Sequence, residues 1–356
     1  MPTLRNPLFA AVLLLAAFGS VQSSRADRAR GPLRVHPENP RYFSDGSGKA
    51  IFLTGSHTWA NLQDYSPLET FVRFDYAGYL DFLQANNHNF MRMWTWESPR
   101  ADGAAVAIDN DQCEPMAYQR IGPGKSNDGG AKFDLSKLNQ AYFDRLRARV
   151  IAARERGIYV SVMLFQGWSV WKYEKNRRTF VYHPFHKDNN VNGVDGDPNG
   201  NGEGEEVHSL GIPAITRLQE TYVRHVIDTV NDLDNVLFEI SNESKDPSSA
   251  WQHHMIRFVQ ACERSKPKQH PVGMTANGGD NSALFASTAE WISPRAQSIG
   301  NKARKNDPAV VNPPVAEGKK VILYDTDHLG PRTSRTTRLF RGHGCGRVSR
   351  AATIPS

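Results

Sequence analysis

Val236-Leu237-Phe238-Glu239-Ile240-Ser241-Asn242-Glu243-Ser244 is the segment that best indicates the fold of this chain. Its apolar and β-branched residues, followed by a polar cluster, predict a short buried strand. In parallel α/β proteins the chemistry lies at the carboxyl ends of the strands, where the loops vary and the strand holds its last residues rigidly. Glu243 at such a position can donate or accept a proton, and the neighbouring amide of Asn242 can bind a hydroxyl group or orient the carboxylate. The pair also fits a helix cap near Ser248 or a solvated loop, so by itself it leaves these interpretations open.

Strands alternate with helices on both sides of this stretch. The predicted strands are residues 49–54, 90–94, 158–165, 236–240, 271–275, 290–292 and 321–324, and the predicted helices are residues 76–86, 138–156, 213–232 and 250–263. Such alternation predicts a parallel sheet covered by helices. Seven strands are one short of a closed eight-stranded barrel. Two long connections, residues 98–131 and the segment that ends at Gly211, are predicted to be functional or disordered loops.

The N-terminus has the character of an export signal. Arg5 precedes an apolar run at residues 8–18 and then a set of small residues, which is typical of a secretory signal peptide and predicts its removal within residues 1–26. The run is too short to span a bilayer. With 356 residues, the rest of the chain suits one barrel-sized domain. The expected location is secreted or periplasmic, without a membrane anchor.

The basic charge of the chain is confined to its C-terminus. Six arginines, with no lysine or acidic residue, lie between residues 330 and 356 and account for the whole formal net charge of +6. The rest is neutral, which argues against a nucleic-acid-binding surface. Residues 330–356 are predicted to be a disordered basic tail. The abrupt change in composition after Leu329 suggests a lost reading frame and a barrel truncated after its seventh strand, and the three cysteines, an odd number, define no disulfide framework.

Four segments resemble a known family. They are Phe52-Leu53-Thr54-Gly55-Ser56-His57-Thr58-Trp59, Asn89-Phe90-Met91-Arg92-Met93-Trp94, Phe238-Glu239-Ile240-Ser241-Asn242-Glu243 and Asp325-Thr326-Asp327-His328. Over residues 33–329 the sequence is similar to the cellulase-like (β/α)8 glycoside hydrolases of clan A, and more closely to a bacterial family of exported cellulase-like barrels. The resemblance implies a TIM barrel that hydrolyses O-glycosidic bonds of a poly- or oligosaccharide with two carboxylates and no catalytic cofactor.

The resemblance also implies roles for individual residues. Glu243 corresponds to the general acid/base, and Asn242 to the residue that contacts the sugar beside the cleaved bond. The nucleophile of the clan comes from the end of the seventh strand and is usually Glu, whereas this chain offers Asp325 and Asp327. We favour Asp327 and a retaining mechanism, for which the two carboxyl groups should lie about 5–5.5 Å apart. Arg92 corresponds to the arginine that keeps the nucleophile ionised.

Polar and aromatic residues at the other strand ends fit a sugar site. Together with Arg92 and Asn242, the expected substrate-binding residues are His57, Trp94, Glu97, Trp168, Asn277 and Trp291. Each tryptophan at a strand end can equally be a packing residue, and the coincidence of polar residues at several strand ends carries the prediction.

The segment 195–206 matches the pattern of a calcium-binding loop, D-x-[DN]-x-[DN]-G-x5-E. Alternating side-chain oxygens suit a hard cation, a glycine at the sixth position makes the turn, and the final glutamate can close the site. The expected ligands are Asp195, Asp197, Asn199, Asn201 and Glu206. No helix is predicted before the loop, so a plain Gly/Asn-rich acidic loop is the alternative.

Two other functions remain open on sequence alone. A chain without its eighth strand could keep the groove and bind carbohydrate without turnover. A metal-dependent hydrolase would need a His/Asp cluster at ligand spacing, and the candidates His183, His186 and Asp325 to His328 are too scattered for one. We expect a monomer whose partner is a carbohydrate, with no nucleic acid or membrane involved.

Overall fold

The protein is built around a curled parallel sheet. The structure is a computed structural model that describes residues 27–67, 71–100, 111–171, 173–174, 177–276, 281–294, 320–325 and 349–352. Seven parallel strands follow one another in the sheet in chain order: β3 (Thr54–His57), β5 (Phe90–Met93), β9 (Tyr159–Gln166), β12 (Val236–Asn242), β13 (Val272–Thr275), β14 (Trp291–Ser293) and β15 (Val321–Ile322). This confirms the predicted α/β barrel that is interrupted after its seventh strand.

An antiparallel strand lies where an eighth parallel strand would be. β17 (Ser349–Ala352) pairs with β3 on one side and with β16 (Tyr324–Asp325) on the other. β16 follows β15 after a single residue, so the circuit of hydrogen-bonded strands closes through this segment. Four residues of the predicted disordered tail therefore form a strand, which corrects that prediction for residues 349–352; the rest of the tail lies outside the described residues.

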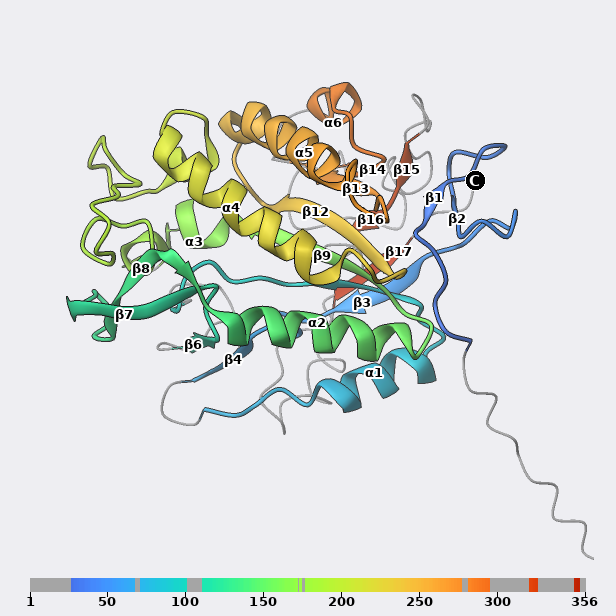
Figure 1. Ribbon diagram of the computed structural model, residues 1–356, viewed down its shortest axis with the longest axis horizontal. Helices are drawn as coiled ribbons and strands as arrows, with labels where there is room; N and C mark the ends of the chain where they lie inside the picture. Colours follow the sequence, from blue (N-terminus) through green and yellow to red (C-terminus); the bar gives the residue numbers. More distant parts are fainter. Residues whose placement is uncertain are drawn as a thin grey trace, which may run out of the picture.

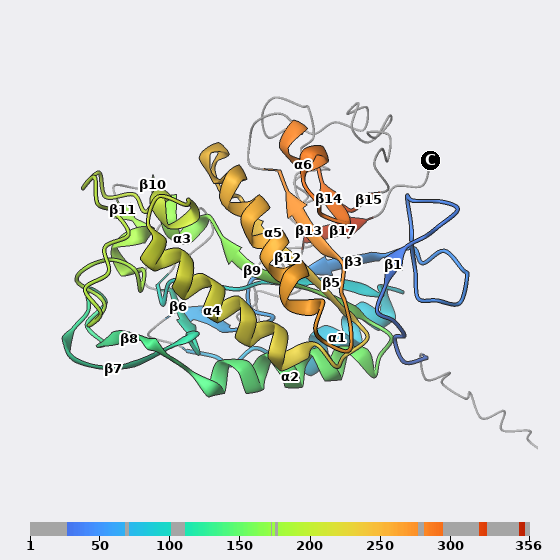
Figure 2. The ribbon, with the colours of Figure 1, turned by 45° about the horizontal axis from the view of Figure 1, so that its top comes forward.

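Helices cover the outer face of the sheet (Figures 1 and 2). They are α1 (Tyr76–Ala85), α2 (Gln140–Arg154), α4 (Pro213–Val230), α5 (Ser249–Glu263) and the short α6 (Ser282–Ala286). The side chains of Asp75 and Asn139 accept hydrogen bonds from the first turns of α1 and α2, and Pro213 stands at the first turn of α4. The four long helices lie within two residues of where the hydrophobic period predicts them.

Neighbouring residues of β5 and β12 belong to two separate apolar clusters. Met91 and Phe238 pack in the large outer cluster between the strands and the helices, whereas Phe90 and Leu237 pack in an inner cluster. Phe43 from the N-terminal hairpin β1 (Arg34–Val35) and β2 (Phe43–Ser44) joins the inner cluster and closes the amino end of the barrel. Because side chains of a strand alternate in direction, Arg92 and Glu239 continue the inner rows of Phe90 and Leu237. The inner face therefore changes from apolar to charged toward the carboxyl ends of the strands.

The long connections carry structure of their own. The predicted loop at residues 98–131 holds strands: β6 (Asp111–Glu114) pairs with β4 (Asp64–Pro67), and β7 (Tyr118–Lys125) forms a hairpin with β8 (Ala131–Leu138). In Figure 1 this hairpin lies at the end of the barrel opposite to β1 and β2. The remaining short elements are α3 (Trp168–Trp171), β10 (Tyr173–Glu174), β11 (Arg177–Arg178) and the 3-10 turns Thr179–Tyr182, Glu205–His208 and Asp246–Ser248.

In the part of the chain that the structure describes, no helix is both long and apolar enough to cross a membrane. The predicted signal peptide at residues 1–26 lies outside that part.

Candidate active site

A buried ionic network joins β5, β12 and β13 toward the carboxyl ends of these strands, with β9 between β5 and β12. Arg92 of β5 donates to both carboxylate oxygens of Glu239 on β12, with Nε 2.9 Å from Oε2. Thr275 of β13 donates to Oε1 of the same carboxylate at 2.8 Å. Arg92 is 4% exposed and Glu239 0%, so both charges are removed from solvent and compensate each other. The contact of Arg92 with a nucleophile on the seventh strand stays a prediction.

The network fixes the amide of Asn242. Arg92 Nη2 donates to Asn242 Oδ1 at 2.8 Å. A side-chain amide has one oxygen and one NH2 group, so an oxygen held by a guanidinium orients the two N–H donors in the opposite direction. Asn242 is the last residue of β12 and lies directly before Glu243. The amide predicted to contact substrate is therefore held rigidly by a buried cation.

Glu243 occupies a strained turn. Its φ is +54°, in the left-handed region that residues with a side chain adopt only rarely. The carbonyl before it, of Asn242, accepts from Gly167 N at 2.7 Å, and its own carbonyl accepts from Trp171 Nε1 at 2.6 Å. A Cβ at Gly167 would lie 2.1 Å from the Glu243 carbonyl oxygen, so only glycine permits this approach. Neighbouring loops thus hold the backbone of Glu243 on both sides.

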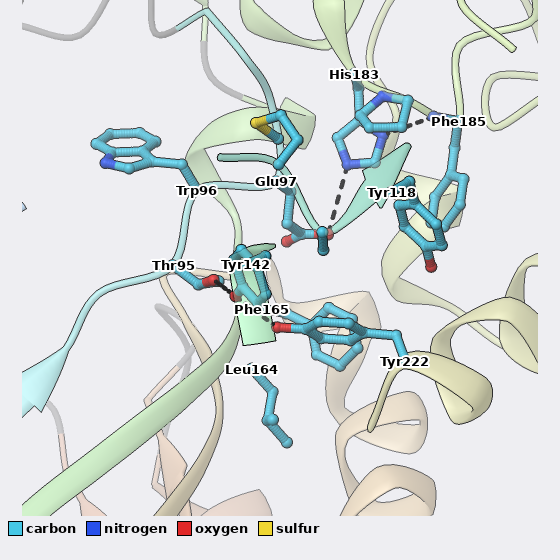
Figure 3. A pocket seen from close by; sticks show the side chains of 13 residues that line it. Thr95, Trp96, Glu97, Tyr118, Tyr142, Leu164, Phe165, His183, Phe185 and Tyr222 are labelled. Carbon is cyan, nitrogen blue, oxygen red and sulfur yellow. Dashed lines mark hydrogen bonds and ion pairs between the residues drawn. The ribbon is translucent and has the colours of Figure 1, made fainter. Parts of the chain in front are cut away.

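A second buried carboxylate, Glu97, lies next to this turn. Its Oε1 is 3.1 Å from His208 Nε2 and accepts from Gln166 N at 2.8 Å, and its Oε2 is 3.5 Å from His183 Nε2. Figure 3 shows Glu97 pointing toward His183. Burial opposes ionisation of Glu97, but the charge of His208 and the hydrogen bonds from both histidines outweigh burial and lower its pKa to about 2. The lowered pKa favours an ionised Glu97 at neutral pH and makes it a poor proton donor.

The side-chain amides of Asn61 and Gln63 hold the segment between β5 and Glu97. Asn61 accepts from Trp94 N at 2.7 Å and donates to Arg92 O at 2.7 Å, and Gln63 accepts from Trp96 N at 2.6 Å and donates to Trp96 O at 3.1 Å. The side chains of Asn61 and Gln63 thus satisfy the backbone beyond β5 as a neighbouring strand would. The chain after Met93 can then stay extended as far as Glu97.

The cavity beside Glu97 is too small for a sugar. It has a volume of about 30 Å³ and is lined by Glu97, His183, three tyrosines and apolar side chains (Figure 3). Tyr142 and Tyr222 hydrogen-bond each other at 3.0 Å, and burial raises the pKa of Tyr142 to about 12. Space of this size, among polar groups, suits one or two buried waters. This cavity therefore cannot bring a sugar into contact with Glu97. We interpret Glu97 as a residue that supports the site.

The predicted aromatic residues are mainly packing residues. His57 stacks on Trp94 with ring centroids 5.7 Å apart and an interplanar angle of 11°, and these residues are 2% and 3% exposed. Trp291 is 1% exposed and belongs to the inner apolar cluster, where its ring lies against Gly273. Its prediction as a substrate-binding residue is wrong, because the strand begins at this residue and buries the indole below the mouth. Trp168 is partly buried in α3.

The structure joins some of the predicted residues and leaves others untested. Arg92 contacts Asn242, Glu243 follows Asn242 in the chain, and Glu97 lies beside them through Gln166. Asn277 and Asp327 lie outside the described residues, and of Asp325 only the backbone, in β16, is described. Sequence reasoning gave no role to Glu239, Thr275, His183, His208 or Ser244. A charged residue inside an apolar strand could have indicated Glu239, whereas nothing local distinguishes the others.

Comparison with known proteins identifies the family. Residues 87–290 match the family model described as Domain of unknown function (DUF6298). The chain belongs to the DUF6298 family. No curated protein matches it. The DUF6298 domain contains Arg92, Glu97, Glu239 and Glu243, whereas Asp325 and Asp327 lie beyond the matched residues.

Solved structures that resemble the chain are glycoside hydrolases by name. A glycoside hydrolase family 5 protein from Bacteroides vulgatus ATCC 8482 is 12% identical with a TM-score of 0.44, over 83% of this chain and 54% of that one. The endo-1,4-beta-mannanase from Rhizomucor miehei is 12% identical with a TM-score of 0.44, over 71% and 68%. Endo-glycoceramidase II from Rhodococcus sp. is 18% identical with a TM-score of 0.39, over 66% and 50%. This chain spans about half the length of the Bacteroides and Rhodococcus proteins, and a likeness at this level defines neither activity nor substrate.

The calcium-like loop of the DUF6298 domain is closed by its own hydrogen bonds. Asp197 accepts from the backbone N–H groups of Asn201 and Gly202, at 3.1 and 2.7 Å, and Asp195 accepts from that of Asp197 at 3.0 Å. Asn199 donates to Glu206. Among the described residues, no three acidic, histidine or cysteine side chains gather closely enough to hold a metal ion. Calcium binding by Asp195, Asp197, Asn199, Asn201 and Glu206 stays a prediction.

A calcium titration tests this prediction. Calcium chloride at about 10 mM is expected to raise Tm by a few degrees, because binding to the folded state at an affinity typical of extracellular sites stabilises it by about 1–3 kcal/mol. Magnesium chloride at the same concentration is the control and should have no effect, since Mg²⁺ demands a smaller octahedral site. An unchanged Tm in calcium chloride would contradict calcium binding by this loop.

The low pKa of Glu97 predicts a loss of stability in acid. Its pKa rises from about 2 in the folded protein to an ordinary value near 4.5 on unfolding, so the folded state is favoured above pH 4.5 and this advantage disappears as the pH falls toward 2. The contribution is on the order of 3 kcal/mol at neutral pH. Urea unfolding of the parent and of Glu97→Gln should give free energies that differ most at pH 6–7 and converge toward pH 2. Parallel curves would contradict the assignment.

Proposed function

We propose that the protein hydrolyses O-glycosidic bonds of a poly- or oligosaccharide, with Glu243 as the general acid/base. One observation carries the proposal: a glutamate in a constrained turn directly follows an amide that a buried arginine fixes, at the carboxyl end of a barrel strand. A fixed amide can hold a sugar hydroxyl while the adjacent carboxyl group protonates the glycosidic oxygen. Rigid placement matters because a displacement of about 1 Å can lower a rate about 100-fold.

The second carboxylate of the proposed reaction comes from the seventh strand. β16 ends at Asp325, and β16 continues a strand parallel to β12, so its last residue reaches the same edge of the sheet as Asn242. We propose Asp327, or failing that Asp325, as the nucleophile of a retaining reaction. It attacks the anomeric carbon while Glu243 gives its proton to the leaving oxygen. Glu243 then takes a proton from the water that hydrolyses the glycosyl ester.

The antiparallel strand β17 favours a second candidate, a carbohydrate-binding protein without turnover. It lies between β3 and β16, where the parallel strand and loop of a complete barrel would supply a further part of the site. In both candidates the protein is proposed to be an exported monomer that binds carbohydrate and needs no catalytic cofactor.

A screen of the purified chain separates the two candidates. Plant and microbial polysaccharides and a panel of 4-nitrophenyl glycosides are incubated with the protein, and released sugar or nitrophenol is measured alongside binding by calorimetry. Turnover that is absent in Glu243→Gln supports the hydrolase, and NMR of the first-formed anomer then distinguishes retention from inversion. Binding without turnover supports the second candidate, and neither binding nor turnover contradicts both.

A further inference from the structure

A chain of buried side chains joins Glu97 to the residue that follows Glu243. Glu97 Oε1 lies 3.1 Å from His208 Nε2, and His208 Nδ1 lies 3.0 Å from Ser244 Oγ. All three residues come from different parts of the chain: the extension of β5, the 3-10 turn Glu205–His208 and the end of β12. We propose that His208 and Glu97 are positioning residues that act through Ser244 to hold the Glu243 turn in its reactive conformation. This inference rests on the proposed function and extends it to residues that touch no substrate.

Each group of the chain can hydrogen-bond the next. An ionised carboxylate can only accept, so His208 Nε2 donates to Glu97. His208 Nδ1 donates to the Ser244 hydroxyl when it carries a proton and accepts from it when it does not, so the two groups stay joined in both cases. The Ser244 hydroxyl is also within hydrogen-bond distance of the hydroxyl of Ser241. Glu97 thus fixes the role of His208 Nε2, and the ring carries the contact on to Ser244.

The imidazole of His208 has little freedom to turn. Its ring stacks on Trp251 with centroids 4.5 Å apart and an interplanar angle of 14°, and its edge faces Phe165. Trp251 is itself held, since its Nε1 donates to Gln219 at 2.9 Å, and Gln219 donates back to the carbonyl of Val207 at 2.8 Å. His208 is 3% exposed and Ser244 1%. Because the imidazole is fixed, its hydrogen bond restrains the position of the Ser244 hydroxyl.

The turn needs such support because its backbone is strained. A non-glycine residue in the left-handed region persists only where its surroundings determine it. Gly167 N holds the carbonyl before Glu243, and Trp171 holds the carbonyl of Glu243. Neither of these contacts restrains the residue that follows, and Ser244 is the point at which the His208 chain does so. Loss of the Ser244 hydroxyl should therefore allow the carboxyl group of Glu243 to move, while the packing of the core stays intact.

The variant Ser244→Ala tests the inference by kinetics. With a 4-nitrophenyl glycoside that the parent hydrolyses, kcat is expected to fall about 10- to 100-fold while KM stays within about twofold, because a displaced acid/base weakens the transition state and not the binding of substrate. The matched control is Ser44→Ala, which removes a buried, hydrogen-bonded serine hydroxyl at the opposite end of the barrel and should leave kcat unchanged. An unchanged kcat in Ser244→Ala overturns the inference.

Hydrogen exchange provides a readout that does not need activity. The amides of residues 241–247 are expected to exchange at least about tenfold faster in Ser244→Ala than in the parent, with no change there in Ser44→Ala. His208→Phe, which keeps the stacking on Trp251 and removes both ring nitrogens, should give the same local increase. If the parent hydrolyses nothing, the proposed function fails and exchange alone decides the inference: faster local exchange supports the hold on the turn, and unchanged exchange overturns it.

Discussion

Replacing Glu243 by glutamine is expected to lower kcat on an aryl glycoside by about 100- to 10,000-fold. The amide keeps the shape and the hydrogen-bonding capacity of the side chain but cannot donate or accept the catalytic proton. The backbone contacts of the turn, from Gly167 and Trp171, involve main-chain atoms of Asn242 and Glu243 and are retained in the variant. Tm and the circular dichroism spectrum should therefore match those of the parent.

The control for this variant is Glu38→Gln. Glu38 is exposed near the N-terminal hairpin, so the same change of charge occurs far from the mouth of the barrel and should leave kcat unaltered. Steady-state kinetics of all three proteins, with the same substrate, give the comparison. Equal turnover in Glu243→Gln and the parent would remove Glu243 from the mechanism.

Replacing Arg92 by leucine is expected to reduce the free energy of unfolding by about 3–5 kcal/mol. The reason is that Glu239, 0% exposed, would lose the buried cation that compensates its carboxylate. The double variant Arg92→Leu/Glu239→Leu should recover most of this loss, since it removes both charges and leaves apolar side chains of similar volume. Urea unfolding of the two single variants and the double variant measures the coupling between the residues.

The matched surface pair is Arg147 and Asp232. These side chains are 41% and 60% exposed, and Arg147→Leu should cost no more than about 1 kcal/mol, because solvent screens the exposed pair. If Arg92→Leu and Arg147→Leu reduce the free energy of unfolding by similar amounts, the buried network does not stabilise the inner face. The double variant should also lose turnover if the protein is a hydrolase, since Arg92 no longer fixes Asn242.

The hydrophobic period of the sequence was sufficient to predict the helices and strands that bury apolar faces. The amphipathic pattern of residues 213–232 and the apolar run of 236–240 correspond to α4 and β12, because burial of one face or both faces imposes a period that can be read locally. The segment 98–131 was less predictable. Its strands pair with distant partners or form a hairpin in which few residues, such as Phe133 and Leu135, are buried, so no long apolar period marks them in the sequence.

The candidate site, too, could be predicted from the sequence only in part. Local sequence indicated Asn242 and Glu243, because a polar pair at the end of an apolar strand is a pattern confined to a few residues. It could not indicate that Arg92 pairs with Glu239, 147 residues later, or that His208 joins Glu97 to Ser244. It also placed Trp291 at the mouth, whereas the indole fills the inner core beside Gly273.

The order of apolar and polar residues along the chain therefore determined the alternating strands and helices, the parallel sheet and the position of Glu243 at a strand end. The charges that meet inside the barrel, the contacts that hold the Glu243 turn, and the antiparallel strand Ser349–Ala352 beside β3 emerged from the folded structure. The difference lies in sequence separation. The apolar period of a helix or strand can be read from residues a few positions apart, whereas buried charges and strained turns depend on distant partners that the folded barrel brings together.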